Sequence, residues 1–176
     1  MDRERIVVVP YDPGWPHRFE AERALLEEIL APWLEGGIHH IGSTAIPGVA
    51  AKPVIDMLAG VHDVKEALAA FDPLGEESYL YDPHRPGIGH HFAKPSQRLA
   101  EMTHGLHLTE PGSDLWLERL AFRDALRGDH DLAAEYEALK IGLADQRRDN
   151  VRAYTIGKGA FVARVLASAG LQPGRR

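Results

Sequence analysis

The stretch HIGSTAIPGVAAKPVIDMLAGV, residues 40–61, decides the fold and directs the search for a site. A short apolar segment runs into a Gly-Ser turn, and then a Pro-Gly turn and a lysine lead into a second apolar segment. Residues 52–61 are apolar on both faces, which is typical of a central strand. This strand contains one acid, Asp56, and such a carboxylate is costly to bury unless another group pairs with it. Asp56 is therefore the first candidate for a functional residue.

Composition limits the function classes. The chain has 176 residues, which suits one domain, and a formal net charge of -6, so we expect no extended nucleic-acid surface. It has no cysteine, which excludes disulfides and cysteine metal sites. We find neither a signal peptide pattern nor an apolar run long enough for a membrane span, and we expect a cytoplasmic protein. The oligomeric state does not follow from the sequence.

Periodicity and turn residues predict an α+β fold with a mixed sheet and a C-terminal helical cap. Strands are predicted at 6–10, 38–43, 52–61, 78–82, 90–95 and 103–110. Helices are predicted at 16–34, 63–71, 113–128, 130–148 and 151–170. No linker divides these elements, so residues 1–176 form a single domain, with a mixed α/β part at roughly 1–112 and a helical part at 113–170.

Three chemistries compete for the stretch after His40. A phosphate-binding P-loop is excluded because Gly42 and Gly48 are too far apart and no lysine follows Gly48. The dinucleotide pattern Gly-x-Gly-x-x-Gly is absent. A nucleotidyltransferase-type site remains, in which a Gly-Ser turn binds phosphates and the following strand carries acids that bind a divalent metal. Asp56, thirteen positions after Ser43, stands about where the first acid of such a strand is expected.

At these residues the chain resembles the GrpB-like family. The resemblance begins at VVPYDPGWPHRFEAE and continues through THGLHLTEPGSDLWLERLAFRDALR, EYEALKIGLA and AYTIGKGAFV, so that it covers nearly the whole chain. It implies a nucleotidyltransferase-like fold, Mg²⁺ or Mn²⁺ bound at Asp56, and a nucleotide such as ATP. A related domain is also fused to dephospho-coenzyme A kinases, which hints at nucleotide or coenzyme metabolism.

One departure from the nucleotidyltransferase pattern bears on catalysis. The pattern places a second acid two residues after the first, and that position is Leu58. A third acid is expected from a neighbouring strand, but neither alternating set in 103–110 contains one. Two-metal transfer is therefore doubtful, although a metal at Asp56 could still bind together with substrate phosphates.

The candidate site residues follow from these arguments. Asp56 and His107 are the predicted catalytic residues, since His107 belongs to a strand expected beside Asp56. The predicted phosphate or cofactor ligands are Gly42, Ser43, Thr44, Lys52, Arg123 and Lys158. Arg123 and Lys158 are better candidates than Lys140 and Arg152, because each has apolar neighbours and matches a basic position of the family. The histidine spacing does not assemble a zinc site from any one segment.

Two functions remain open. The first is a nucleotidyl- or phosphoryl transferase that binds a nucleotide or another phosphorylated small molecule in a cleft between the sheet and the helices. The second is a catalytically degraded module that binds such a ligand without turning it over. Leu58 favours the second function.

Overall fold

The computed structural model describes residues 6–83, 89–146 and 150–172. Its centre is a five-stranded sheet with the strand order β1-β2-β5-β4-β3. Among the described strands, β2 and β5 are parallel, and the other neighbouring pairs are antiparallel. The strands are β1 (Leu34–Ile41), β2 (Ile55–Val61), β3 (Leu80–Tyr81), β4 (His90–Lys94) and β5 (His104–Thr109). The predicted α+β class with a mixed sheet is confirmed, and β2 is an interior strand as its composition predicted.

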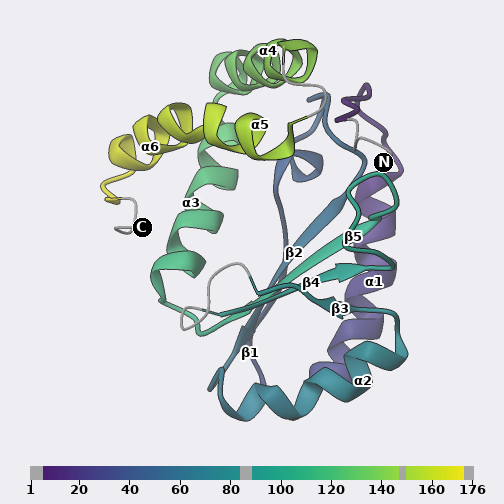
Figure 1. Cartoon of the computed structure of the whole chain (residues 1–176). Helices are drawn as coiled ribbons and strands as arrows, with labels where there is room; N and C mark the ends of the chain where they lie inside the picture. Colours follow the sequence, from purple (N-terminus) through teal and green to yellow (C-terminus); the bar gives the residue numbers. More distant parts are fainter. Residues whose placement is uncertain (1–5, 84–88, 147–149, 173–176) are drawn as a thin grey trace.

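Helices lie on both sides of this sheet. Figure 1 shows α1 and α2 on one side and α3 to α6 on the other. The helices are α1 (Trp15–Leu30), α2 (Phe71–Glu76), α3 (Asp114–Gly128), α4 (His130–Gln146), α5 (Val151–Gly157) and α6 (Gly159–Ser168). Short 3₁₀ turns follow β1 at Ser43–Ala45 and precede α2 at Glu66–Ala70. Within the described residues we find no helix with the length and apolar composition that a membrane span requires.

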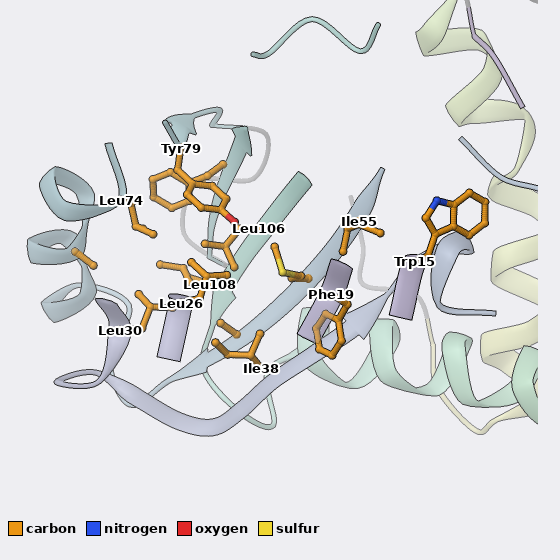
Figure 2. Close-up of a cluster of buried hydrophobic side chains, with 14 of the residues drawn as sticks. Trp15, Phe19, Leu26, Leu30, Ile38, Ile55, Leu74, Tyr79, Leu106 and Leu108 are labelled. Atoms are coloured by element: carbon orange, nitrogen blue, oxygen red, sulfur yellow. The ribbon is translucent and has the colours of Figure 1, made fainter. Parts of the chain in front are cut away.

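The main core lies between α1 and the sheet. Figure 2 shows Leu26 and Leu30 of α1 beside Leu106 and Leu108 of β5, and all four side chains are 0% exposed. The same cluster includes Trp15, Phe19, Ile38, Ile55, Met57, Ala59, Leu74 and Tyr79. The buried residues of α1 thus form an apolar stripe that packs on the sheet.

A second core holds the loop after β1 against the helical part of the chain. Ile46 and Val49 of this loop are buried together with Tyr136 of α4 and with Phe161 and Val165 of α6. The Gly-Ser turn at the end of β1 therefore lies between two packed units, the sheet and the helices.

Several predicted elements differ in the structure. Residues 6–10 are not a strand, because Val9 makes only an isolated bridge to Ala51. The first helix ends at Leu30 and not at residue 34, and the helix predicted at 63–71 is a 3₁₀ turn that leads into α2. The helix predicted at 151–170 is broken at Lys158 into α5 and α6. The last two residues of the helix predicted at 130–148 lie outside the described residues.

Candidate functional site

Asp56 lies on β2 and is directed away from the α1 core. Its neighbours Ile55 and Met57 are buried in that core, so alternation along the strand turns Asp56 to the opposite face, on the side of α3. In the sheet register, Asp56 is opposite Ile41 of β1 and Gly105 of β5. The predicted acid is therefore half-buried within the sheet and faces the helical part of the chain.

Two glycines leave the space that the Asp56 carboxylate occupies. A Cβ atom on Gly105 would lie 2.7 Å from Oδ1 of Asp56, and one on Gly42 would lie 2.6 Å from Oδ2. Gly42 also has a φ of 70° and a ψ of -172°, a backbone conformation that is essentially restricted to glycine. Glycine at position 42 is thus required both by the turn and by the carboxylate, and glycine at position 105 is required by the carboxylate.

Three cations act on the ionisation of Asp56. They are Lys52, which precedes β2, Arg119 of α3, and Lys158 at the junction of α5 and α6. Burial raises the pKa of the Asp56 carboxyl, and the positive charges of these three residues oppose that rise. We call these four residues the Asp56 cluster. Within this cluster, the charges of three basic residues act on one carboxylate.

The pKa of Lys158, another member of the Asp56 cluster, is also strongly perturbed. Burial, together with the charges of Lys52 and Arg119, lowers the pKa of its ammonium to about 8, although Asp56 acts in the opposite direction. Nζ of Lys158 lies 4.6 Å from the centre of the Tyr154 ring, and Nζ of Lys52 lies 5.9 Å from it. Tyr154 is 1% exposed, so a buried aromatic ring supports both ammonium groups. An anion placed beside Lys158 would raise this pKa again.

The loop between β1 and β2 is tied to α4. At its start, the Ser43 hydroxyl donates to Oη of Tyr136 at 3.5 Å. Near its end, the Ala50 carbonyl accepts a hydrogen bond from Lys140, and the Ala50 amide donates to Glu137 at 2.5 Å. These contacts fix the Gly-Ser turn relative to α4.

His107 lies on the same face of the sheet as Asp56. It follows Gly105 by two residues on β5, and alternate residues of a strand share a face. The His107 and His91 ring centres are 4.4 Å apart, and Nδ1 of His91 lies 3.6 Å from a carboxylate oxygen of Asp82. A row of two histidines and an aspartate therefore flanks the Asp56 cluster.

The structure brings most of the predicted site residues together. Those in or beside the Asp56 cluster are Gly42, Ser43, Lys52, Asp56, His107 and Lys158. Thr44 has a different role, because it is 2% exposed and its hydroxyl donates to the Val54 carbonyl at 2.9 Å. That hydroxyl also bonds to Nε2 of His40 at 3.0 Å, so Thr44 stabilises the turn.

Arg123 lies outside the Asp56 cluster. Its guanidinium donates to the His40 carbonyl at 3.3 Å and pairs with Asp124. Arg119, one turn earlier on α3, is the arginine that acts on Asp56, and the sequence prediction missed it. The two arginines are spaced i, i+4 on one predicted helix, and this spacing is the sequence signal by which both could be predicted as candidate site residues.

The residues around Asp56 do not fit a two-metal site. Leu58, at the position of the expected second acid, is 0% exposed and shares the sheet face of Asp56. In the part of the chain that the structure describes, no three His, Cys, Asp or Glu side chains are grouped so that they could hold a metal ion. A metal at Asp56 would take most of its oxygen ligands from phosphates and water. Binding of Mg²⁺ or Mn²⁺ at Asp56 stays a prediction.

Known proteins resemble this chain over almost its whole length. A family model described as GrpB protein matches residues 5–168. The glutamate-rich protein GrpB of Alkalihalophilus pseudofirmus is 34% identical over 170 residues, which cover 94% of this chain and 97% of that protein. The crystal structure of conserved protein GrpB from Enterococcus faecalis has a TM-score of 0.84 and 30% identity, covering 93% of this chain and 96% of the other.

Some relatives are much longer than this chain. It spans 46% of the UPF0157 protein YqkA of Bacillus subtilis, with 34% identity over 162 residues that cover 91% of this chain. It spans 44% of a dephospho-CoA kinase of Mycolicibacterium paratuberculosis, with 30% identity over an alignment of 187 positions that covers 89% of this chain. The expected relationship to proteins named dephospho-CoA kinase is therefore found.

Proposed function

Since this chain belongs to the GrpB family, we propose that it binds a phosphorylated small molecule of the nucleotide class at the Asp56 cluster. One observation carries the proposal: the charges of Lys52, Arg119 and Lys158 all act on a single half-buried carboxylate, and the two lysine ammonium groups share the buried Tyr154 ring. Cations brought together in this way repel one another, and the lowered pKa of Lys158 reflects that cost together with its burial. A bound phosphate would lower the repulsion between these cations.

The surrounding residues have matching roles in this proposal. The Gly42 turn and the Ser43 hydroxyl provide hydrogen-bond donors to phosphate oxygens beside the cations. Asp56 accepts a hydrogen bond from a ligand hydroxyl or binds a metal that the phosphates also coordinate. His107 lies on the same sheet face, where it can donate to a phosphate or move a proton.

A binding function is favoured over nucleotidyl or phosphoryl transfer, because Leu58 occupies the position of the second metal-binding acid. Transfer remains the competing function, since the Gly-Ser turn and Asp56 lie side by side as that chemistry would require. Measuring pyrophosphate or labelled nucleotide released from ATP with Mn²⁺ separates the two. Release by the wild type that Asp56→Asn abolishes would favour the transferase.

The binding proposal is tested by calorimetry and melting temperature with ATP and with dephospho-coenzyme A, each with and without Mg²⁺ or Mn²⁺. The second ligand is chosen because a relative is named dephospho-CoA kinase. A ligand at a hundred times its Kd should stabilise the protein by about 2.7 kcal/mol. Lys158→Met keeps the apolar stem and removes the charge, so it should weaken binding about tenfold or more.

Two further variants sharpen this test. Lys65→Ala removes an exposed lysine that directly precedes the 3₁₀ turn Glu66–Ala70 and is not part of the Asp56 cluster, so this variant should bind like the wild type. Asp56→Asn should keep the fold and lose whatever affinity the metal adds. The proposal is wrong if neither ligand binds the wild type, or if Lys158→Met binds as tightly as Lys65→Ala.

A further inference from the structure

A cavity of about 300 Å³ lies beside the edge strand β1, between α1 and α3. The turn after β1 borders both this cavity and the Asp56 cluster, because Thr44 and Ala45 line the cavity while the preceding Gly42 lies against the Asp56 carboxylate. We call this cavity the α1–α3 pocket. Its volume is at the lower end of the range for small-molecule sites.

Three arginines line the α1–α3 pocket. Arg123 and Arg127 are one turn apart on α3, and Arg23 comes from α1. Glu20 is the acid among the described lining residues, and it pairs with Arg23 at 2.8 Å. Arg123 pairs with Asp124 at 2.7 Å. Arg23 also lies 3.6 Å from Glu27, so two of the three arginines are paired with acids. Arg127 makes no direct ion pair with the described residues, although the charge of Asp124 acts on it, so its guanidinium is the best placed of the three to bind an anion.

Backbone contacts hold the two arginines of α3 in position. Nε of Arg127 donates to the Ala45 carbonyl at 2.8 Å, and Nη1 of Arg123 donates to the His40 carbonyl at 3.3 Å. A guanidinium held through Nε retains its two terminal nitrogens for another acceptor. Burial and the charge of Arg123 lower the pKa of Arg127, an effect that a bound anion would reverse.

An aromatic wall completes the α1–α3 pocket. The rings of Phe19 and His40 are stacked, with centres 4.8 Å apart and planes at 11°. Because the Thr44 hydroxyl donates to Val54, Nε2 of His40 must donate to Thr44. Burial, with the charges of Arg127 and Arg123, lowers the pKa of His40 to about 4, so its ring is neutral at neutral pH. The wall is therefore flat and uncharged beside the arginines.

We propose that the α1–α3 pocket is a second anion site, which binds the phosphate group of a small phosphorylated molecule through Arg127 and Arg123. A guanidinium binds phosphate oxygens through paired, charge-assisted hydrogen bonds. The remaining volume and the aromatic wall accommodate the organic part of the ligand. This site is separate from the Asp56 cluster, and its existence does not depend on the function proposed there.

The test titrates the whole chain with inorganic phosphate and follows the Nε–Hε NMR signals of its arginines. The Arg127 signal should shift and saturate. Arg127→Gln should weaken phosphate binding about tenfold or more. Two controls should keep the wild-type affinity at this site: Arg98→Gln, which removes an arginine whose side chain is 72% exposed, and Lys158→Met in the Asp56 cluster.

The outcomes separate this site from the Asp56 cluster. The proposal is overturned if phosphate leaves the Arg127 signal unmoved, if Arg127→Gln binds like Arg98→Gln, or if only Lys158→Met loses binding. Melting curves check that Arg127→Gln is folded, and Arg127→Lys, which keeps the charge, should bind with intermediate affinity. A second titration with glycerol phosphate distinguishes the ligand source. If glycerol phosphate binds more tightly than inorganic phosphate, the ligand has an organic part. If the two bind equally, the ligand at the same site is free phosphate.

Discussion

Replacing Gly105 by alanine tests whether the Asp56 carboxylate is what requires glycine on β5. The added Cβ would lie 2.7 Å from Oδ1 of Asp56 and 3.0 Å from Cε of Met102. The Met102 contact involves the flexible end of a side chain. The carboxylate is confined by Gly42 on its other side, so it cannot move away freely.

The cost can be estimated from the structure. An ordinary contact of about 3.5 Å would require the Cβ and the carboxylate oxygen to separate by about 0.8 Å. Overpacking of this kind costs about 1–3 kcal/mol. Alanine also reduces the entropy of the unfolded chain, which returns about 0.4–1 kcal/mol. We therefore expect Gly105→Ala to lower the free energy of unfolding by about 1–2 kcal/mol, or the melting temperature by about 3–6 °C.

A double-mutant cycle with Asp56→Ala provides the assay, with urea unfolding as the measurement. Removing the carboxylate should relieve the clash, so Gly105→Ala should cost about 1 kcal/mol less in the Asp56→Ala background. The contact with Met102 is present in both backgrounds and cancels. Gly142→Ala is the matched control, because a Cβ there meets nothing within 4 Å on α4. It should stabilise the protein by about 0.5–1 kcal/mol.

An equal cost of Gly105→Ala in both backgrounds would refute the reasoning. The strand or the Met102 side chain would then be what requires glycine at position 105, and the Asp56 carboxylate would not be the reason for it.

Two further predictions concern buried positions. Leu58→Asp would place an unpaired charge at a residue that is 0% exposed, so it should destabilise the fold by more than about 3 kcal/mol in urea unfolding, whereas Leu58→Met should cost less than about 1.5 kcal/mol. If adding Mn²⁺ and nucleotide restored the stability of Leu58→Asp, this would instead show that positions 56 and 58 form a metal-binding pair. Burial and the charge of Lys158 lower the pKa of Lys140 from 10.5 to about 7, so between about pH 7 and 10 the unfolded chain binds more protons than the folded chain. The contribution of Lys140 to the free energy of unfolding should therefore rise with pH in that window. Urea unfolding across the same window should show that the free energy of unfolding of Lys140→Met rises less steeply with pH than that of the wild type. An equally steep rise in both proteins would contradict the lowered pKa.

The elements that depend on local signals were predictable. β2 was recognised as interior because it is apolar on both faces. Helix α3 begins at a local signal, because Ser113 accepts a hydrogen bond from the Trp116 amide at 3.2 Å and so caps the helix. The Gly-Ser turn and Asp56 were chosen because a lone acid in such a strand needs a partner, and the structure places the turn against that acid.

The elements that depend on distant partners were not predictable. Val9 belongs to a β-branched run, yet a strand needs a neighbour along its whole length, and Val9 finds one only at Ala51. The break at Lys158 likewise reflects packing between helices. A Cβ on Gly157 would lie 2.6 Å from the Leu143 side chain, so α5 approaches α4 closely there.

The sequence by itself determined the acid, the turn before it and the basic residues available to them, because residue type and strand or helix period are local properties. Only the tertiary structure decided which cations meet Asp56. The orientation of α3 over the sheet brings Arg119 to the carboxylate and carries Arg123 to the α1–α3 pocket. That orientation is set by the packing of whole helices on a sheet, and a packing energy shared among many side chains is not encoded in any single stretch of the chain.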